Sequence, residues 1–283
     1  MKRLFFFLTL CFLSLLIGEG IYFFRKGFSP RRLQFFDLKK EVSLDKEAEK
    51  ILSQPFYFLG RGRQCFAFES EDGKYVLKCP RTDIYKLPFW VRAFPFETHE
   101  KHLREDKTKR QKFVFESFRI ACEELQEETG TIATHLGTSP PSKTKLTLVD
   151  ALGGSHHFPL HTTLFVLQHK RDLWSPAFLK AKKNRDTAEQ ERLLHAFVDI
   201  VIERAKKGVL NRDRSFLRNY GFDGKKAYQI DVGDFFHIPN MTREDVFQKS
   251  VRDSLDPVQE WLAKIDPQML EVLNRRIENL ALN

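Results

Sequence analysis

Two apolar segments with a period of two, residues 56–70 and 75–79, limit the folds open to this chain more than any other feature. Successive side chains of a β-strand face opposite sides, so this alternation predicts strands that each bury one face. Asp72 and Gly73 stand between the two segments, and this dipeptide is typical of a tight hairpin turn. We therefore expect a β-hairpin in this part of the chain.

Further along the chain, the apolar spacing switches between the helical and the strand period. It predicts a long helix or helix pair over 98–130, strands within 131–170, a helix over 187–207, and further helices towards the C-terminus. The prolines of two Asp-Pro pairs, Pro257 and Pro267, are expected at helix starts, because proline fits the first helical turn. A β-rich part with one helix, followed by a helical part, predicts an α+β protein with two lobes.

Composition limits the partners and the chemistry of the chain. A formal net charge of +9 over 283 residues favours anionic partners such as phosphates, acidic lipid surfaces or nucleic acid. The basic run over 99–112 alternates with Glu and Asp, which is typical of a solvated helix face, so nucleic acid is not an expected partner. The 4 cysteines have no short paired spacing, which argues against a disulfide framework and against a zinc site.

The N-terminus combines basic and apolar residues. Lys2 and Arg3 precede an apolar run over 4–17, and more apolar residues follow Gly20. One helix over 4–24 would be about 30 Å long, which is enough to cross a bilayer. The alternative is a signal peptide that is cleaved after Gly20. We expect an uncleaved single-pass anchor, with a secreted protein as the alternative.

Two glycines and a lysine mark a candidate phosphate site. Gly60 and Gly62 stand between strand-like runs, where a tight turn could bring backbone N–H groups against phosphates. Lys78 follows on the next apolar strand. Burying its ammonium group requires an anionic partner, which a phosphate or a carboxylate could supply.

A helix carboxylate is one such partner. Glu116 lies on the border of the apolar face of the helix predicted over 98–130. A pair between Glu116 and Lys78 would hold the lysine ready for a phosphate. Glu123 and Glu124 lie on the same predicted helix, and the choice among the three carboxylates stays open.

Two aspartates, Asp213 and Asp231, end apolar segments in the C-terminal half of the chain. A carboxylate beside a substrate hydroxyl can accept its proton, which is a role for Asp213. A second carboxylate can hold Mg²⁺ together with an asparagine oxygen, because this hard ion prefers oxygen ligands. Asp231 and Asn219 are the candidates for that metal site, although each residue alone is also typical of a turn.

The order of these features resembles the protein-kinase-like superfamily, over roughly residues 56–235. The resemblance implies that a glycine-rich hairpin covers ATP phosphates, that the next strand's lysine contacts them, and that a helix glutamate pairs with this lysine. It also implies a catalytic aspartate that acts on the acceptor, and an asparagine and a D-x-G aspartate that bind Mg²⁺. In this chain these roles fall on Gly60, Gly62, Lys78, Glu116, Asp213, Asn219 and Asp231.

The chain departs from the family pattern at several points. Cys65 stands in the place of the third loop glycine. Asn219 follows Asp213 by six residues where five is usual, and Arg218 occupies the expected place. D-V-G replaces D-F-G, and the segment after Gly233 is short, as in atypical kinases such as lipopolysaccharide-core and antibiotic kinases.

Together the residues and the resemblance predict an α+β, two-lobed kinase-like fold that follows an N-terminal hydrophobic helix. The expected parts are an anchor or signal peptide over 1–26, a linker over 27–54, a β-rich N-lobe over 55–170 and a short helical C-lobe over 171–283. The expected function is transfer of the ATP γ-phosphoryl group to a protein, sugar or lipid hydroxyl by an anchored, cytosol-facing domain that uses Mg²⁺. The alternatives are a catalytically weak pseudokinase scaffold and a secreted basic adaptor or effector.

Overall fold

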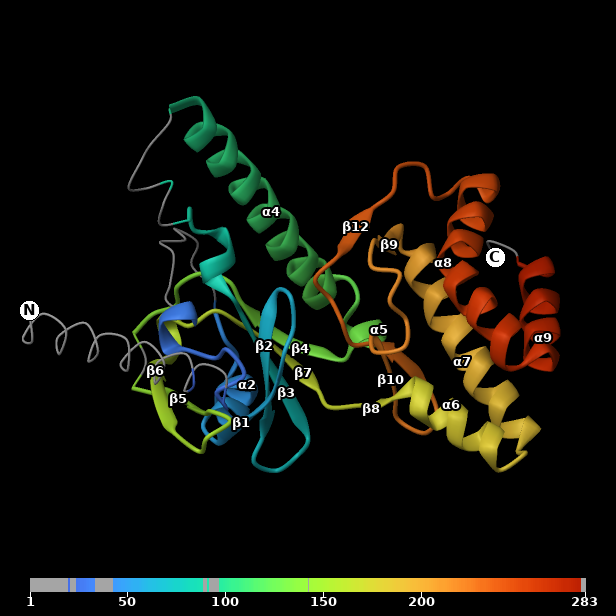
Figure 1. Cartoon of the computed structure of the whole chain (residues 1–283), viewed down its shortest axis with the longest axis horizontal. Helices are drawn as coiled ribbons and strands as arrows, with labels where there is room; N and C mark the ends of the chain where they lie inside the picture. The colour runs from blue at the N-terminus through green and yellow to red at the C-terminus, as the bar shows by residue number, and fades with distance from the viewer. Residues whose placement is uncertain are drawn as a thin grey trace, which may run out of the picture. The chain divides into compact units, whose positions relative to one another are not determined.

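The computed structural model describes residues 20, 24–33, 43–88, 91, 97–141 and 143–280. Within these ranges the chain is α+β, as predicted (Figure 1). It divides into two compact units, which we describe separately. The first unit comprises Met1–Lys107 and Ala133–Leu167, and the second comprises Thr108–Ile132 and Gln168–Asn283.

A seven-stranded mixed sheet has the strand order β4-β7-β3-β2-β1-β5-β6. Strands β1, β2 and β3 pair antiparallel in sequence, as do β5 and β6, whereas β1 and β5 pair parallel. The strands are β1 (Pro55–Arg61), β2 (Cys65–Ser70), β3 (Tyr75–Pro80), β4 (Thr131–His135), β5 (Lys145–Val149), β6 (Ser155–Pro159) and β7 (Phe165–His169). Short helices η1 (Pro30–Leu33), α2 (Lys46–Leu52), η2 (Thr82–Tyr85) and η3 (Leu160–Thr162) accompany them.

The predicted hairpin joins β2 and β3 and is confirmed, with Phe68 opposite Leu77. Gly73 adopts a φ of 70°, the left-handed region that favours glycine. The Ser70 hydroxyl donates to the Asp72 carboxylate at 2.7 Å, and this bond lowers the pKa of Asp72. Local turn chemistry therefore fixes the register of this hairpin.

The segment 24–33, which we call the N-terminal strap, packs on the seven-stranded sheet of the first unit. The Phe28 ring is 1% exposed and lies 5.3 Å from the Phe66 ring, edge to face. Arg25 pairs with the Asp150 carboxylate at 3.1 Å, in the turn between β5 and β6. An apolar side chain and an ion pair thus both attach the strap to the sheet.

The second unit is mainly helical. Trp174 is fully buried at its centre, where the indole N–H donates to the Leu193 carbonyl at 2.7 Å. Helix α7 runs beside α8 and α9 (Figure 1). The helices are α4 (Glu97–Glu123), which enters from the first unit, α5 (Gln126–Thr129), α6 (Trp174–Lys183), α7 (Thr187–Lys206), α8 (Glu244–Ile265) and α9 (Pro267–Glu278).

Five short strands complete the second unit. Strands β8 (Asp172–Leu173), β10 (Tyr220–Phe222) and β11 (Ala227–Gln229) form one small sheet, and β9 (Val209–Asn211) pairs with β12 (Phe235–His237). These strands carry the segments that contain the two candidate aspartates.

The prediction of a helix start at Pro257 is wrong. Pro257 lies inside α8, whereas Pro267 does begin α9. Buried residues at helical spacing continue on both sides of Pro257, at Val251, Leu255, Val258 and Leu262. This continuous apolar stripe keeps the helix together. The carbonyl that lacks a partner belongs to residue 253, whose position is exposed, so water can satisfy it.

The prediction of a single-pass membrane protein is also wrong for the part of the chain that the structure describes. Helices α4, α7 and α8 are long, but they carry many charged residues. Within the described ranges, no helix combines the length and the apolar character that a bilayer crossing requires. The hydrophobic helix expected over 1–26 lies outside the described residues, except for Gly20 and residues 24–26.

Candidate functional site

The glycine hairpin joins β1 to β2. The Gly62 N–H donates to the Cys65 carbonyl at 2.8 Å and closes the turn. The pairing register shifts between Phe58 and Gly60, so β1 contains a bulge. Neither Gly60 nor Gly62 has a positive φ, and a Cβ added at Gly60 would meet nothing within 4 Å. The fold of the first unit therefore gives no steric reason for a glycine at position 60.

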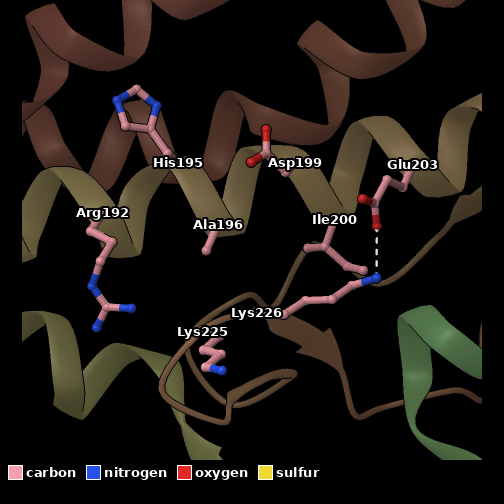
Figure 2. A pocket seen from close by; sticks show the side chains of 8 residues that line it. All are labelled: Arg192, His195, Ala196, Asp199, Ile200, Glu203, Lys225 and Lys226. Atoms are coloured by element: carbon pink, nitrogen blue, oxygen red, sulfur yellow. Dashed lines mark ion pairs between the residues drawn. The ribbon is translucent and has the colours of Figure 1, made fainter.

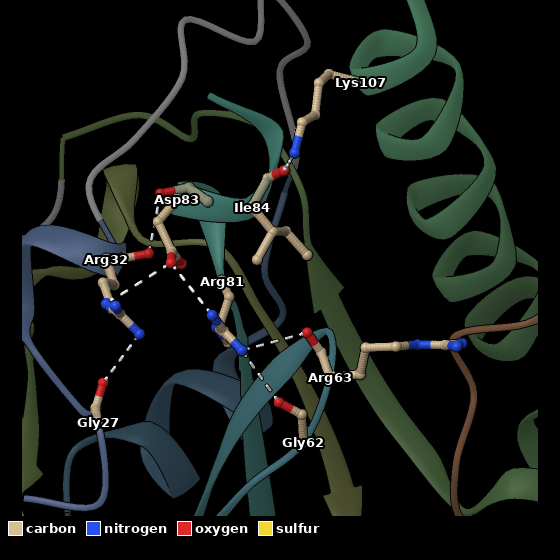
Figure 3. Close-up of polar contacts among 9 residues, drawn as sticks. Gly27, Arg32, Gly62, Arg63, Arg81, Asp83, Ile84 and Lys107 are labelled. Carbon is tan, nitrogen blue, oxygen red and sulfur yellow. Dashed lines mark hydrogen bonds and ion pairs between the residues drawn. The ribbon is translucent and has the colours of Figure 1, made fainter. Parts of the chain in front are cut away.

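Arg81, directly after β3, donates hydrogen bonds to backbone carbonyls of this turn (Figure 3). Its backbone N–H donates to the Gln64 carbonyl at 2.8 Å. Its guanidinium group donates to the carbonyls of Gly62 and Arg63, both at 3.5 Å. Two parts of one residue thus connect the end of β3 to the tip of the neighbouring hairpin.

Asp83 connects Arg81 to the N-terminal strap (Figure 3). The Asp83 carboxylate lies 3.2 Å from Arg81 and 3.6 Å from Arg32 of the strap. The Thr82 hydroxyl, which is fully buried, donates to the Arg32 carbonyl at 2.9 Å. The strap therefore reaches the glycine turn through a chain of charged side chains.

Lys78 lies in β3, opposite Ala67 of β2. Its neighbours Leu77 and Cys79 are fully buried, whereas Lys78 is half-buried, so it belongs to the face of the sheet that lies opposite this core. Burial raises the pKa of the Cys79 thiol well above its usual value, and this cysteine is a core residue. The strand lysine is thus separated from the core by the pleat of β3.

Arg119 contacts two of the three helix carboxylates that were considered as partners of the strand lysine. Its guanidinium donates to Glu116 and to Glu123, and these hydrogen bonds raise the pKa of Arg119. Glu124 lies 3.3 Å from His237. The strand lysine and Glu116 belong to different units, and their pairing stays a prediction.

A short antiparallel pair joins the two aspartate-bearing segments of the second unit. Strands β9 and β12 place Asn211 opposite Phe235. Just beyond them, the Arg212 N–H donates to the Asp234 carbonyl at 2.9 Å. Segments that are distant in sequence therefore meet directly beside the N-R-D and D-V-G motifs.

The Asn211 side chain contacts the backbone of both candidate aspartates. Its carbonyl oxygen accepts the Asp213 N–H at 2.7 Å, and its amide donates to the Asp231 carbonyl at 3.5 Å. Asp213 is half-buried, and one of its carboxylate oxygens accepts the Ser215 N–H at 2.8 Å. Asp231 is exposed. One asparagine thus fixes where these two residues stand relative to each other.

The backbone of Asn219 contacts the loop that contains Asp231. Its carbonyl accepts the Ile230 N–H at 2.8 Å and the Asp231 N–H at 3.4 Å. The Asn219 residue is only 6% exposed, and its side-chain nitrogen has no hydrogen-bond partner among the described residues. Arg218, which occupies the usual asparagine position, is exposed. The shifted asparagine therefore lies close to Asp231 in the backbone, but its side chain is buried.

The described residues were predicted to include a metal site of few ligands. Within the described ranges, no three His, Cys, Asp or Glu side chains are grouped as metal ligands. The residues predicted to hold Mg²⁺ are Asp231 and Asn219, whose oxygens are of the type that this hard ion prefers. Metal binding by these residues stays a prediction.

Arg204 of α7 is a residue that sequence reasoning missed. It is 2% exposed, donates to the Tyr220 hydroxyl at 3.2 Å, and also donates to the Gln229 side chain. Tyr220 directly follows Asn219 in the chain, and Gln229 directly precedes Ile230. The signal was present in the sequence, because Arg204 continues the apolar helical spacing of Phe197 and Val201.

A pocket of about 330 Å³ lies in the second unit, beside α7 and the turn between β10 and β11 (Figure 2). Several of its charged groups are paired, since Lys226 lies 3.1 Å from Glu203 and Asp199 lies 2.8 Å from Arg276. Neither candidate aspartate belongs to it. The lining residues are Arg192, His195, Ala196, Asp199, Ile200, Glu203, Lys225 and Lys226.

Comparisons with known proteins give little further guidance. No protein-family model matches the chain. No curated protein matches it either. Two solved structures of WbdD are similar to it, one of them described as a high-resolution crystal structure and the other as the bifunctional kinase-methyltransferase WbdD.

The likeness to WbdD is low. The first structure has a TM-score of 0.34 and 16% identity, and the match covers 69% of this chain and 37% of that one. The second has a TM-score of 0.33 and 17% identity, over 68% of this chain and 34% of that one. The chain thus spans about a third of the length of the structures it matches. A likeness at this level does not assign a family or an activity.

Proposed function

We propose that this protein is a divergent ATP-dependent phosphotransferase of the kinase-like type. The observation that carries the proposal is the contact of Asn211 with the backbones of Asp213 and Asp231. It joins the two loops from which a kinase-like enzyme takes its catalytic and its metal-binding carboxylates. The acceptor is a hydroxyl group on a protein, a sugar or a lipid.

In this proposal each candidate residue has one role. The acceptor oxygen bonds to the γ-phosphorus, the bond from that phosphorus to the ADP oxygen breaks, and the hydroxyl proton passes to Asp213. Asp231 holds Mg²⁺, which neutralises phosphate charge when it is bound. Lys78 and the backbone N–H groups near Gly60 and Gly62 bind the phosphates.

A pairing of Glu116 with Lys78 belongs to the same proposal, because it would keep the ammonium group in place for the phosphates. Asn219 is the remaining candidate ligand for the metal. Its backbone is close to Asp231, and its side chain would have to turn outward to reach an ion.

Nucleotide-induced thermal stabilisation tests this function. ATP with Mg²⁺ is expected to raise the melting temperature of the wild type, whereas Lys78→Ala and Asp231→Ala abolish the shift. Asp213→Ala is expected to bind nucleotide but to lose phosphoryl transfer. Lys74→Ala and Asp253→Ala are matched controls, because both side chains are exposed in the same units. A wild type that gives no shift with any divalent metal contradicts the proposal.

A nucleotide-binding scaffold is the second candidate, and the burial of Asn219 favours it. An asparagine that does not reach the metal leaves binding to Asp231 alone, which weakens catalysis more than affinity. This candidate predicts that the wild type binds nucleotide without hydrolysis or phosphoryl transfer. Asp213→Ala is then expected to bind nucleotide as the wild type does.

A further inference from the structure

A buried hydroxyl group closes the turn that follows Asp231. Ser117 of α4 is fully buried. Its hydroxyl donates to the Val232 carbonyl at 2.5 Å and accepts the Phe235 N–H at 2.6 Å. In a standard turn of four residues, the first carbonyl accepts the fourth N–H directly. Here the hydroxyl of a distant helix is inserted between these two backbone groups.

The chemistry of this position is narrow. A single atom must donate one hydrogen bond and accept another, and among small side chains only a hydroxyl does both well. Alanine at Ser117 would leave the Val232 carbonyl and the Phe235 N–H buried without their partner. Both Val232 and Phe235 lie in the core, so water cannot replace the hydroxyl freely.

Helix α4 holds the hydroxyl in place. Val114, Phe118 and Ala121 are buried around the same stretch of the helix, so it cannot rotate without exposing apolar surface. Glu116 directly precedes Ser117 in the chain. Glu116, which is proposed to pair with Lys78, is therefore the direct neighbour of the residue that closes the turn.

Two backbone contacts of the loop come from residues that flank short strands. The Asn219 carbonyl accepts the Asp231 N–H, and the Arg212 N–H donates to the Asp234 carbonyl. Ser117 adds a contact from a helix, which bonds to the residues on either side of Gly233 and Asp234.

We propose that Ser117 is a positioning residue, which sets the direction of the Asp231 carboxylate by closing the Val232–Phe235 turn from α4. The stretch of α4 around Ser117 and the loop over 231–235 are then one hydrogen-bonded element of the second unit. The expected effect of Ser117 on Mg²⁺ binding rests on the proposed function, whereas its effect on the turn itself is independent of any ligand.

The test compares Ser117→Ala with two further variants. Ser117→Thr keeps the hydroxyl group, and Thr129→Val removes a different buried hydroxyl of the same unit, which bonds to the Leu125 carbonyl at 2.7 Å. Ser117→Ala is expected to raise the Mg²⁺ concentration for half-maximal ATP-induced stabilisation about tenfold, because it removes both hydrogen bonds that close the turn. Ser117→Thr is expected to stay close to the wild type. Thr129→Val is expected to lose stability without a change in this Mg²⁺ concentration.

Hydrogen exchange without ligand provides the second readout. Amide exchange at Phe235 is expected to be faster in Ser117→Ala than in the wild type, and unchanged in Thr129→Val. If Ser117→Ala does not fold, Ser117→Cys replaces it, because a thiol is a weak donor and acceptor that still fills the site.

The outcomes separate the two proposals. Unchanged exchange at Phe235 and an unchanged Mg²⁺ requirement in Ser117→Ala overturn the role of Ser117. An equal shift of the Mg²⁺ requirement in Thr129→Val overturns it as well, since the effect would then follow general stability. A wild type that binds no Mg²⁺–nucleotide overturns the proposed function, while the exchange experiment still decides whether Ser117 holds the turn.

Discussion

The side-chain amide of Asn211 donates to the backbone carbonyl of Asp231 over 3.5 Å. The same side chain accepts the Asp213 N–H over 2.7 Å, so one residue acts on both aspartate-bearing loops. The shorter contact fixes the turn at Asp213, and the longer one is the link between the loops. Substitutions that remove one contact at a time can separate these two effects.

Asn211→Ala is expected to lower the free energy of unfolding by about 1 kcal/mol, the usual value of a hydrogen bond, and to weaken Mg²⁺-dependent ATP stabilisation. Asn211→Asp keeps the acceptor for the Asp213 N–H and removes the donor to Asp231. It is expected to retain most of the stability and to weaken nucleotide stabilisation as Asn211→Ala does. Chemical denaturation and thermal shifts measure the two quantities, and wild-type behaviour of Asn211→Asp would show that the longer contact is unimportant.

Arg204 is expected to couple energetically to Gln229, because the buried guanidinium donates to that side chain. Arg204→Met should reduce the free energy of unfolding by about 1–3 kcal/mol, since Gln229 and the Tyr220 hydroxyl lose their donor. Gln229→Leu in the Arg204→Met background should recover part of this loss by removing one unsatisfied group. A double-mutant cycle in urea measures the coupling, and strictly additive effects would contradict it.

The Asp150 carboxylate is expected to make stability depend on pH in acid. Burial favours a higher pKa, but hydrogen bonds from His156 and from the N–H groups of Gly154 and Leu152, together with the charge of Arg25, lower the pKa of Asp150 below its usual value. The unfolded chain therefore binds this proton at a higher pH than the folded protein. The stabilisation is complete above the unfolded pKa and is lost as the pH falls through the folded pKa.

Asp150→Asn is accordingly expected to be less stable than the wild type at pH 7, and the difference should shrink as the pH falls below about 4, the ordinary range of an aspartate pKa. Denaturation midpoints between pH 7 and pH 2.5 measure this difference. Asp253→Asn, at an exposed position, is the control and should run parallel to the wild type. A difference that stays constant across the acid range would show that Asp150 acts through packing alone.

The N-terminal strap is expected to contribute directly to the stability of the first unit. Phe28→Ala should lower the free energy of unfolding by about 3–5 kcal/mol, as is usual for a buried phenylalanine. Phe24→Ala is the matched control, because Phe24 is 65% exposed in the same segment, whereas Phe28 is 1% exposed. Equal stability of the two variants would mean that the strap does not dock as the structure describes.

Local signals in the sequence predicted much of the fold. The turn at Asp72 and Gly73 and the helix that ends before Gly208 are set by nearby residues, and both agree with the structure. Pro257 was misplaced because an apolar stripe outweighed a local helix-breaking signal. The membrane anchor was an inference from hydropathy, and the described helices are too charged to support it.

The candidate site was predicted less completely, for a physical reason. Residue types and their order identified Asp213 and Asp231, and their roles stay predictions. The contacts that hold them, from Asn211 and Ser117, depend on which distant segments meet in three dimensions. Arg204 was missed altogether, although its spacing from Phe197 and Val201 places it on the apolar face of α7.

The ion pair between Arg25 and Asp150 also has a consequence for synthesis. A ribosome makes about 5–20 residues per second, so Arg25 and Phe28 emerge well before the turn that carries Asp150 exists. Until β5 and β6 have been made, Arg25 lacks its Asp150 partner, whereas Phe66 and Asp83, which contact Phe28 and Arg32, have already been made. The contacts of the strap are thus completed in two steps during synthesis, first those with β2 and η2 and then the ion pair with Asp150.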